Sequence, residues 1–283
     1  MARITHASEI NGDIPMPVAR RIRYIARNVL RNVGGFAAPV SMRQWVFPHS
    51  VLTNRDIRGT SPARILGEAF VIHELPKLTI PRPLRVLDIG CGSGRMSDLL
   101  AKAGYGGHYT GVDVQDRFDS VRWQGGAFTI DFVKGDAHAL NLEPGFDLIV
   151  SNSALEHIPD DGKLIARLQT LLARHGLQVH LVPSAWALFL YLWHGYRQYG
   201  RGAIAARFTR RDTQVYKLGG AACFLAHFFF ITVPEILLRI SLRKKFPALY
   251  AALLCSALRM DHLLPFMSSG YAIVSRTESG PRD

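Results

Sequence analysis

The sequence contains few cysteines and no long apolar run. Its three cysteines (Cys91, Cys223 and Cys255) are too few and too scattered for a disulfide framework or a four-ligand zinc site, which predicts a reducing compartment. The start of the chain holds no long apolar stretch, so we expect neither a signal peptide nor an N-terminal anchor. The apolar stretches 185–193 and 223–231 fall short of the roughly 18–20 residues that a membrane span needs, so we expect no transmembrane helix.

Acidic residues are also scarce, and their distribution is uneven. The chain has 22 acidic residues against 34 Lys and Arg, a net charge of +12. Residues 1–64 carry a net +7 and residues 184–269 a net +8, whereas residues 65–183 carry −3 and residues 270–283 are neutral. Two basic segments rich in apolar residues thus flank a mildly acidic middle. This favours an acidic partner: an anionic membrane surface, a phosphorylated substrate or nucleic acid.

The middle of the chain has the pattern of an α/β protein. With 283 residues and 48% hydrophobic content, the chain can bury a substantial core, which excludes a disordered protein. Short apolar runs alternate with helical stretches, as expected for a parallel sheet with crossover helices. Helices are predicted after Arg95 and over 160–175, where apolar residues share one face. The predicted strands cover 84–89, 108–114, 128–134, 146–151, 176–183 and 270–276.

The spacing of residues in the flanking segments predicts two basic amphipathic helices. The first covers 18–33, with an apolar stripe opposite an arginine-rich side. Its stripe is Val18, Ile22, Ile25, Val29 and Val33, and its arginines are Arg20, Arg23, Arg27 and Arg31. The second covers 232–247, where Thr232 and Glu235 have the spacing of a capping box. Such helices suit a membrane surface, a lid over a site or simply a solvated basic face.

The strongest local motif is Val86-Leu87-Asp88-Ile89-Gly90-Cys91-Gly92-Ser93-Gly94. Three glycines after a strand let the backbone turn tightly and approach a ligand, and the following helix offers free N–H groups. The dinucleotide fingerprint G-x-G-x-x-G would need glycine at position 95, which is arginine here. A pyrophosphate is disfavoured beside a carboxylate, whereas a ligand with an ammonium group suits Asp88.

Further acidic residues follow the next two predicted strands. Asp113 in TGVDV has the position of a carboxylate that binds ribose hydroxyls. Asp136 in VKGDA, with the backbone N–H of Ala137, suits the edge of an adenine. The loop SNSALEHIP (151–159) follows the fourth strand. Because parallel strands end at one edge of the sheet, these residues are expected to lie together at the ligand-binding edge.

Taken in order, VLDIGCGSG, VDV, GDA and FDLIVSNSALEHIP resemble the motifs of class I S-adenosylmethionine-dependent methyltransferases, most of all the small-molecule group that includes the ubiquinone and menaquinone methyltransferases. The resemblance covers about 84–183 and the last strand. It implies an α/β, Rossmann-like sheet of seven mostly parallel strands with one antiparallel strand and helices on both faces. The sixth of these strands is not located by the sequence.

The resemblance also implies the domain organisation. Residues 1–64 would form an N-terminal basic segment with an amphipathic helix, and 65–183 the core that binds S-adenosylmethionine. Residues 184–269 would form a basic, apolar helical insertion before the last strand, expected to bind the acceptor. Residues 270–283 would supply the last core strand and a tail.

The cofactor implied by the resemblance is S-adenosylmethionine, and its binding residues follow from the matched motifs. The loop and the acid before it would hold the methionine part: Asp88, Gly90, Gly92, Ser93 and Gly94. Asp113 would bind the ribose hydroxyls, and Asp136 and Ala137 the adenine. Ser151 would line the side that carries the sulfonium.

Candidates for catalysis are fewer. His157 lies in the loop expected nearest the methyl group, where it could serve as a general base or as a structural hydrogen-bonding residue. Glu156 suits a solvated or helix-capping acid. His194 and Tyr196 could reach over the site or belong to a packed aromatic cluster. We find no group of residues with metal-ligand spacing in the sequence, so a metal-independent reaction is expected.

The resemblance implies an S-adenosylmethionine-dependent methyltransferase, and we expect it to act on oxygen or nitrogen of a small-molecule, glycan or lipid-linked acceptor. The basic flanks favour an acidic acceptor and contact with a membrane surface. We therefore expect a cytoplasmic protein, peripheral at the inner face of a membrane. One alternative is a nucleic-acid methyltransferase or binding protein, although the Asn/Asp-Pro-Pro-aromatic loop is missing and no RNA-binding module is visible. Another is a non-catalytic protein that binds the cofactor and acts through partners.

Overall fold

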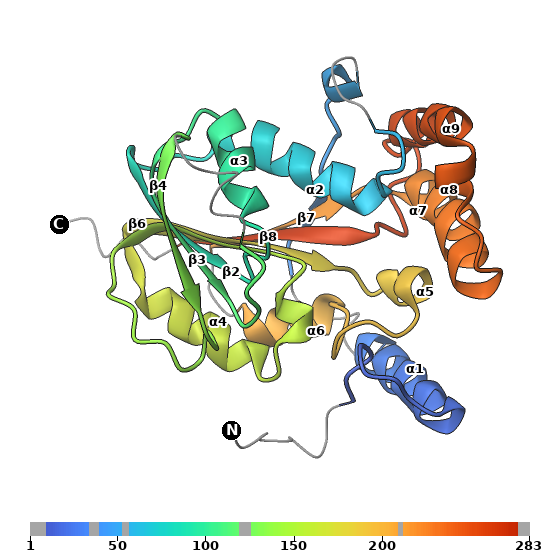
Figure 1. The fold of residues 1–283 in the computed structure, drawn as a ribbon, viewed down its shortest axis with the longest axis horizontal. Helices are drawn as coiled ribbons and strands as arrows, with labels where there is room; N and C mark the ends of the chain where they lie inside the picture. Colours follow the sequence, from blue (N-terminus) through green and yellow to red (C-terminus); the bar gives the residue numbers. More distant parts are fainter. Residues whose placement is uncertain (1–9, 34–39, 53–56, 119–125, 209–211, 277–283) are drawn as a thin grey trace.

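The computed structural model describes residues 10–33, 40–52, 57–118, 126–208 and 212–276. Within these residues a single sheet of eight strands forms the centre of the molecule. Helices cover both faces, with α2 and α3 on one side and α4 and α6 on the other (Figure 1). The strands are β1 (Met42–Gln44), β2 (Leu84–Ile89), β3 (Gly107–Asp113), β4 (Phe128–Lys134), β5 (Phe146–Asn152), β6 (Leu172–Pro183), β7 (Thr213–Leu218) and β8 (Gly270–Arg276).

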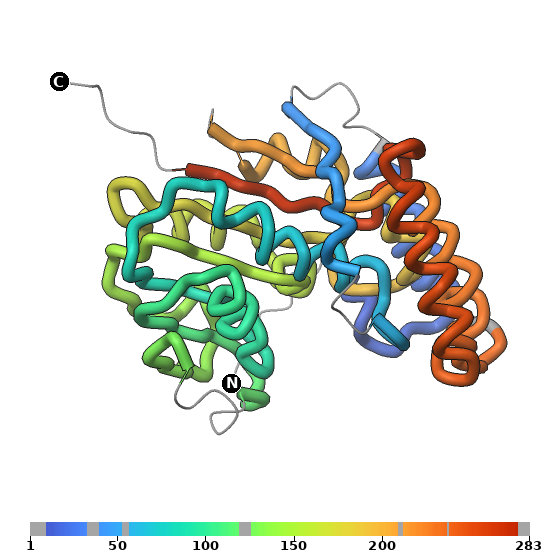
Figure 2. The backbone as a smooth tube through the Cα atoms, turned by 90° about the horizontal axis from the view of Figure 1, so that it is seen from above, coloured from blue at the N-terminus to red at the C-terminus, as the bar shows by residue number. Residues whose placement is uncertain are grey.

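The helices are assigned as follows. Regular α-helices are α1 (Val18–Val33), α2 (Pro62–His73), α3 (Arg95–Lys102), α4 (Asp161–Thr170), α5 (Ala187–Tyr191), α6 (Arg201–Arg207), α7 (Ala221–His227), α8 (Leu242–Lys245) and α9 (Pro247–Met260). Short 3₁₀ turns are η1 (His49–Leu52), η2 (Leu75–Lys77) and η3 (Leu155–His157), and η4 (Phe228–Leu237) is a π-helix. Figure 2 shows α7, η4, α8 and α9 gathered at one end of the sheet.

The strand order is β1-β7-β8-β6-β5-β2-β3-β4, and every neighbouring pair is parallel except the two that involve β8. The predicted fold class is therefore confirmed, including the single antiparallel strand. The predicted number of strands was wrong, since the described residues contain eight rather than seven. The additional strand is β1, whose residue Met42 pairs with Val215 of β7. The N-terminal segment thus contributes to the sheet itself.

The insertion 184–269 is not wholly helical. Residues Thr213–Leu218 form β7, the strand that the sequence did not locate, and it lies between β1 and β8. Its polar residues Thr213, Gln214 and Lys217 break the continuous apolar pattern of a buried strand. A short strand near the edge of the sheet tolerates this pattern, because one of its neighbours is only three residues long.

The helix predicted over 160–175 is shorter than expected. Helix α4 ends at Thr170, and β6 begins at Leu172. The carbonyl of Leu171 accepts hydrogen bonds from the N–H groups of Gly145 and Phe146, at 2.9 and 3.0 Å. These bonds join the chain to the sheet about one turn before the predicted end of the helix at residue 175, although apolar residues keep the spacing of a helix as far as Leu172.

The predicted capping box at Thr232 and Glu235 was also wrong. Thr232 lies inside the π-helix η4, and its hydroxyl donates to the carbonyl of Leu190 at 2.7 Å. Glu235 accepts hydrogen bonds from Arg243 and Ser241 instead of a backbone N–H. Both side chains therefore connect η4 to other segments. The hydrogen bonds that Thr232 and Glu235 make with other segments therefore outweigh the local spacing that predicts a capping box.

Apolar side chains fill both sides of the sheet. One core cluster packs α2, α3, α7 and α9 against the sheet, and a second packs α4 and α6 against the opposite face. Parallel strands covered on both faces explain the nearly continuous apolar runs of β2 and β5. Among the described residues, no helix combines the length and the apolar character needed to span a membrane.

Candidate functional site

The glycine loop after β2 is built as its sequence indicates. Gly90, Gly92 and Gly94 all have positive φ angles, of 70°, 53° and 82°. Gly94 is the N-cap residue of α3, so the free N–H groups of that helix face the loop. At Gly90 a Cβ atom would lie 2.4 Å from the Cβ of Ala154, because the loop after β5 packs directly against it. At Gly92 a Cβ atom would meet no atom within 4 Å, so the backbone there is open to a ligand.

Asp113 lies at the end of β3, next to β2, and faces this loop. Its Oδ2 accepts a hydrogen bond from the N–H of Gly92 at 2.9 Å, and its Oδ1 accepts one from Gln115 at 2.8 Å. A carboxylate has about four acceptor sites, so further sites remain for the two hydroxyls of a ribose. The same side chain thus fixes the loop and offers acceptors at the edge of the sheet.

Asp88 lies deeper than a surface ligand-binding acid. Its side chain is buried at the end of β2 and accepts a hydrogen bond from the hydroxyl of Tyr109. Burial raises the pKa of Asp88 to about 7, and the nearby charge of Asp113 adds to the increase. A buried carboxyl group with this pKa gains most from a cation close by. This is the electrostatic setting that an ammonium group would meet.

The remaining predicted cofactor residues occupy two settings. Asp136 and Ser93 are exposed at the carboxyl edge of the sheet, and Asp136 accepts a hydrogen bond from the N–H of His138 at 2.9 Å. Ala137 is buried beside them. Ser151 differs, because its side chain is fully buried and its hydroxyl lies 2.8 Å from Nδ1 of His180 on β6. The hydroxyl completes a polar pair inside the sheet. That Ser151 lines the sulfonium side stays a prediction.

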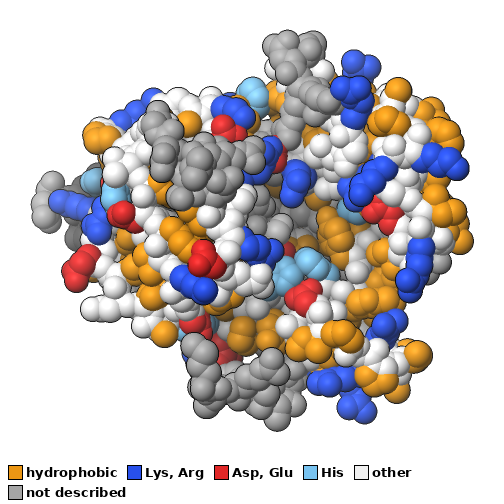
Figure 3. Space-filling view, in the orientation of Figure 1, with side chains coloured by type: hydrophobic (Ala, Val, Ile, Leu, Met, Phe, Trp, Pro, Cys, Tyr) orange, Lys and Arg blue, Asp and Glu red, His pale blue; other side chains and the backbone are white. Residues whose placement is uncertain are grey.

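A cavity opens at the carboxyl ends of β5 and β6 and the start of β8, lined in part by the loop after β5. It has about 580 Å³ of empty space, part of it open to solvent. Histidine and acidic side chains gather near the middle of the face that Figure 3 shows. Most of the wall is apolar or aromatic, and its polar groups come from Asn152, Ser153, Glu156, His194 and Ser269. Such a cavity has the lining typical of small-molecule sites.

Glu156 is the buried acid of this cavity, which excludes the solvated role expected from the sequence. Its side chain is almost fully buried, and its Oε2 has no hydrogen-bond partner among the described residues. Burial raises the pKa of Glu156 to about 7, although the nearby His157 opposes the increase. A buried carboxyl oxygen without a partner is costly, so its place at a cavity indicates a group that binds a ligand donor.

His157 is paired with an acid that the motifs did not reveal. Its Nδ1 lies 2.7 Å from Oδ2 of Asp13, in the segment before α1. Burial alone would raise the pKa of Asp13, but a hydrogen bond from the Gly195 N–H and the contact with His157 lower it. The charged carboxylate favours the tautomer of His157 that carries its proton on Nδ1. Nε2 is then the basic nitrogen, 4.0 Å from Oε1 of Glu156.

Residues from the insertion complete the cluster. The rings of His194 and His157 lie edge to face with their centroids 4.5 Å apart, and Nδ1 of His194 is 3.4 Å from Asp13. Burial and the nearby His157 lower the pKa of His194. Tyr196 contributes its backbone N–H, which donates to the carbonyl of Glu156 at 2.7 Å.

The cluster has a metal-ligand spacing that the sequence does not show. One ligand atom from each of Glu156, His157 and His194 lies within 4.8 Å of the others. Because His194 is far from the other two along the chain, only the fold brings the three together. A metal-independent reaction therefore stays a prediction.

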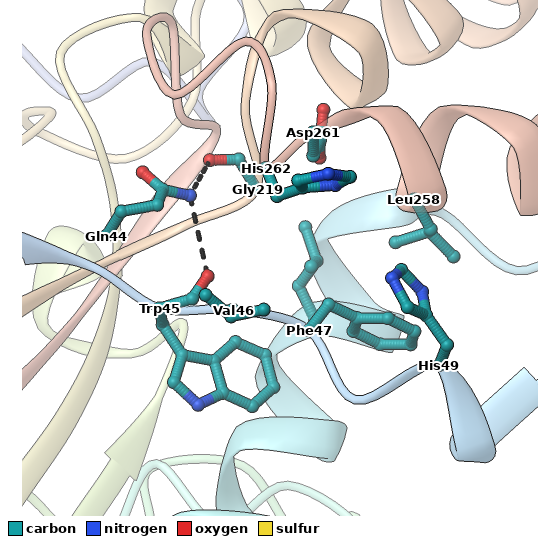
Figure 4. Close-up of a pocket in the computed structure, with 10 residues that line it drawn as sticks. Gln44, Trp45, Val46, Phe47, His49, Gly219, Leu258, Asp261 and His262 are labelled. Carbon is teal, nitrogen blue, oxygen red and sulfur yellow. Dashed lines mark hydrogen bonds between the residues drawn. The ribbon is translucent and has the colours of Figure 1, made fainter.

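A second, smaller cavity lies between β1 and α9 and has about 260 Å³ of empty space (Figure 4). The amide of Gln44 crosses it and donates to the carbonyl of Gly219 at 2.9 Å. Asp261 is buried here, and its Oδ1 accepts a hydrogen bond from the N–H of Cys223 in the first turn of α7. The acid thus stabilises a helix start, and none of the residues predicted to bind the cofactor reaches this cavity.

The comparison with protein families agrees with this geometry. A family model described as a methyltransferase domain matches residues 64–214, more than half of the chain. The chain belongs to this family, the class I S-adenosylmethionine-dependent methyltransferases. The cofactor of the class is S-adenosylmethionine. The open backbone at Gly92, the acceptor sites of Asp113 and the buried Asp88 fit its methionine and ribose parts.

Two curated relatives cover part of the chain. A ubiquinone biosynthesis O-methyltransferase of Hydrogenovibrio crunogenus is 29% identical over 154 residues, which are 50% of this chain and 59% of that protein. A malonyl-(acyl-carrier protein) O-methyltransferase of Calditerrivibrio nitroreducens is 33% identical over 91 residues, 32% of this chain and 35% of that protein. The chain thus spans about a third to three fifths of the length of these relatives.

One solved structure shares the fold over most of the chain. It is a candidate sarcosine dimethylglycine methyltransferase of Galdieria sulphuraria, with 14% identity and a TM-score of 0.52. The match covers 91% of this chain and 99% of that protein. The likeness shows the architecture alone, since the sequences differ at most positions.

Proposed function

We propose that this protein transfers the methyl group of S-adenosylmethionine to a hydroxyl oxygen of a small acceptor with a largely apolar body. The cavity at the ends of β5 and β6 carries this proposal, because it contains Glu156 with an unpartnered carboxyl oxygen. The loop after β5 that lines it also packs against Gly90 through Ala154. Both curated relatives described above are named as O-methyltransferases, which supports oxygen as the acceptor atom.

The chain's own residues supply three tasks. The glycine loop with Asp88 and Asp113 holds the cofactor, which when bound supplies an activated methyl group on sulfur. The cavity positions the acceptor and excludes water, which accounts for much of the rate enhancement in a group transfer. A base is needed as well, because an alcohol or phenol hydroxyl loses its proton when it becomes a methyl ether.

His157 is the base in this proposal. Asp13 holds its Nδ1 proton, which leaves Nε2 to accept the proton of the acceptor hydroxyl. His157 is not among the residues that line the cavity, but its Nε2 lies 4.0 Å from Oε1 of Glu156, which lines it. Glu156, next to Nε2, either accepts a hydrogen bond from the acceptor or stabilises the positive charge that develops on His157. This arrangement follows the usual logic of a base oriented by a carboxylate.

The lining of the cavity narrows the acceptor class. The described lining residues include two tyrosines, Tyr191 and Tyr271, and apolar side chains such as Leu181 and Leu218, but no Lys or Arg. The acceptor is therefore uncharged around its reacting hydroxyl and has an apolar body, as a phenol does. An acidic or lipid-linked acceptor, as the basic flanks favour, would place its charge outside this cavity.

The test uses the purified full chain and S-adenosylmethionine labelled on the methyl group. Hydroxylated aromatic and aliphatic acceptors are compared with the same molecules already methylated on oxygen. We expect label to appear only in the hydroxylated set. Labelling of the pre-methylated molecules at the same rate, or no labelling of any hydroxylated acceptor, would contradict the proposal.

A variant whose cavity is filled by a bulky side chain tests acceptor binding separately from cofactor binding. Ala63 lines the cavity from α2, so Ala63→Trp should remove methyl transfer and leave the affinity for S-adenosylhomocysteine unchanged. Ala206→Trp, at an exposed position of α6, is the matched control and should retain both. Transfer at the wild-type rate by Ala63→Trp would show that the acceptor binds elsewhere.

A further inference from the structure

Helix α1 exposes several large apolar side chains to solvent. Ile22 is 62% exposed and Leu30 is 72% exposed, and Val18 is exposed as well. The buried positions of the helix are instead Tyr24 and Asn28. An amphipathic helix of a globular protein normally buries its apolar side against the core, whereas here Val18 and Ile22 of the predicted stripe are exposed and Ile25 is partly buried.

Helix α1 is attached to the rest of the protein through the buried side chain of Tyr24, which leaves Val18 and Ile22 exposed to solvent. The hydroxyl of Tyr24 donates to the carbonyl of His194 at 2.7 Å and accepts from Gln198 at 3.1 Å. Met16, Tyr24 and Leu188 form a small apolar cluster at the same contact. Tyr24 thus attaches the helix near the candidate site, and Arg21 stacks on the ring of Trp193. Val18, Ile22 and Leu30 remain exposed.

The segment around η4 and α8 has the same character. Phe229, Phe246 and Leu249 are exposed, and Leu238 is 62% exposed. Residues 238–249 contain Arg239, Arg243, Lys244 and Lys245 and no acid. Exposed aromatic and aliphatic side chains next to several cations are unusual for a surface in contact with water alone.

Helix α5 connects these two elements. Its Leu188 packs against Met16 and Tyr24 of the N-terminal segment, and its Leu190 carbonyl accepts a hydrogen bond from Thr232 of η4. Trp186, which is partly exposed at the start of α5, contacts Phe224 of α7 with ring centroids 6.3 Å apart. Figure 1 shows α1, α5 and α8 at the same end of the molecule. We call the exposed sides of α1, α5 and 228–249 the apolar–basic surface.

The positive charges on the apolar–basic surface favour an anionic partner. Helix α1 has five arginines and no acid over Val18–Val33. Figure 3 shows basic and apolar side chains along the edge over α8 and α9 and again over α1, with few acidic ones. A nucleic-acid backbone would pair with the cations but would leave the exposed apolar side chains in water. An anionic lipid surface accommodates both, with apolar side chains below the headgroups and Arg and Lys among them.

We propose that the apolar–basic surface binds a membrane rich in anionic lipids, with α1 lying in the interface. This docking does not depend on methyl transfer. It has a consequence for the candidate site, because the segment of α5 that faces the membrane continues into Tyr191 and His194, which line the acceptor cavity. A lipid-borne acceptor would then enter the cavity from the membrane side.

The test is flotation of the full chain with vesicles of phosphatidylcholine, with and without phosphatidylglycerol. We expect binding at least about tenfold stronger to the anionic vesicles, and weaker binding as salt increases. The variant Ile22→Ser/Leu238→Ser should lose about tenfold or more in binding, since it removes apolar groups from the interface. Val114→Ser is the control, because Val114 is 65% exposed, directly follows β3 and lies outside the apolar–basic surface, so this variant should bind as the wild type does.

Binding of S-adenosylhomocysteine by each variant shows that the fold is intact. The proposal is overturned if the anionic vesicles do not bind the protein, if neutral vesicles bind it equally, or if Ile22→Ser/Leu238→Ser floats as the wild type does. It is also overturned if sedimentation shows a dimer that the same variant abolishes, or if that variant loses binding to RNA while vesicles do not bind. In those cases the surface is an interface with protein or with nucleic acid.

Discussion

The two halves of the candidate site are built in different ways. The cofactor half uses consecutive loops after β2, β3 and β4, and the relevant residues lie within a stretch of the chain that ends at Ala137. The acceptor half combines Asp13, Glu156 and His194, which come from three distant segments. The first half is therefore readable from local motifs. The second exists only once the chain has folded.

The two halves of the site also meet different physical requirements. The loop must bring backbone N–H groups close to a ligand that is common to the class, so glycines and acids recur at fixed spacing. The acceptor half must match one particular molecule, and many side chains can line such a cavity. If the two halves act independently, a substitution in one half should leave the function of the other unchanged.

The largest expected effect is the loss of kcat when His157, the proposed base, is replaced. With an acceptor identified by the labelling experiment, His157→Ala should lower kcat about a thousandfold and leave the affinity for S-adenosylhomocysteine unchanged. Asp13→Asn should lower kcat about tenfold and shift the pH dependence of kcat, because the pairing that orients His157 is weakened. His175→Ala, at an exposed position of β6, is the control. A wild-type kcat in His157→Ala would exclude the residue as the base.

The next effect is on the cofactor half. Asp113→Ala should weaken S-adenosylhomocysteine binding about a hundredfold, because two hydrogen bonds to a charged acceptor are lost and the Gly92 N–H loses its partner. Calorimetric titration measures the change. Asp116→Ala removes an exposed acid three residues further on and should bind as the wild type does. Equal losses in the two variants would indicate a general effect of charge.

A third prediction concerns the buried acid of the acceptor half. The pKa of Glu156 is raised from 4.5 to about 7, so the folded state holds its proton more tightly than the unfolded state. The wild type should therefore lose stability relative to Glu156→Gln as pH rises from 4.5 to about 7, and the difference should stay constant above that range. It should reach about 3 kcal/mol in urea unfolding. Glu143→Gln, at an exposed position, should show no such trend.

Much of the fold could be predicted from the sequence, because buried parallel strands are marked by continuous apolar runs. Strands β2, β4 and β8 have the predicted bounds. Strand β7 could not be predicted, since its polar residues suit its position near the edge of the sheet. The stripe of α1 was predicted correctly as a pattern, but nothing local shows that Tyr24 rather than Ile22 is buried.

The candidate site divides in the same way. The glycines of the loop and Asp113 follow from motif spacing and lie together in the structure. The Ser151 hydroxyl could not be placed, because its partner His180 lies on another strand. Glu156 was expected to be a solvated or helix-capping acid, but in the folded chain it is buried, with Gly195 and Tyr196 of the insertion packed against it.

A fourth prediction separates two constraints on glycine. Gly59 and Gly90 both have φ of 70°, but a Cβ atom would meet nothing at Gly59 and the Cβ of Ala154 at Gly90. Gly59→Ala should cost about 1 kcal/mol of stability from backbone strain alone. Gly90→Ala should cost about 2 kcal/mol more, because the loops after β2 and β5 must move apart. Equal costs in urea unfolding would show that the contact with Ala154 is not tight.

The smallest expected effect is proton release on cofactor binding. At pH 7 about half of the Asp88 carboxyl groups carry a proton, and an ammonium group nearby favours the charged form. Binding of S-adenosylhomocysteine should therefore release about half a proton. Titrations in two buffers with different ionisation heats measure it. Asp88→Asn should remove the difference between buffers, and an unchanged difference would assign the proton to another group.

The most direct test of this division is the affinity for S-adenosylhomocysteine in two variants, measured by calorimetry beside the folded wild type. We expect His157→Ala to bind as tightly as the wild type and Asp113→Ala to lose about a hundredfold, because the two changes lie in different halves of the site. If the folded wild type fails to bind, or if Asp113→Ala binds as the wild type does, then the glycine loop and Asp113 do not form the cofactor site.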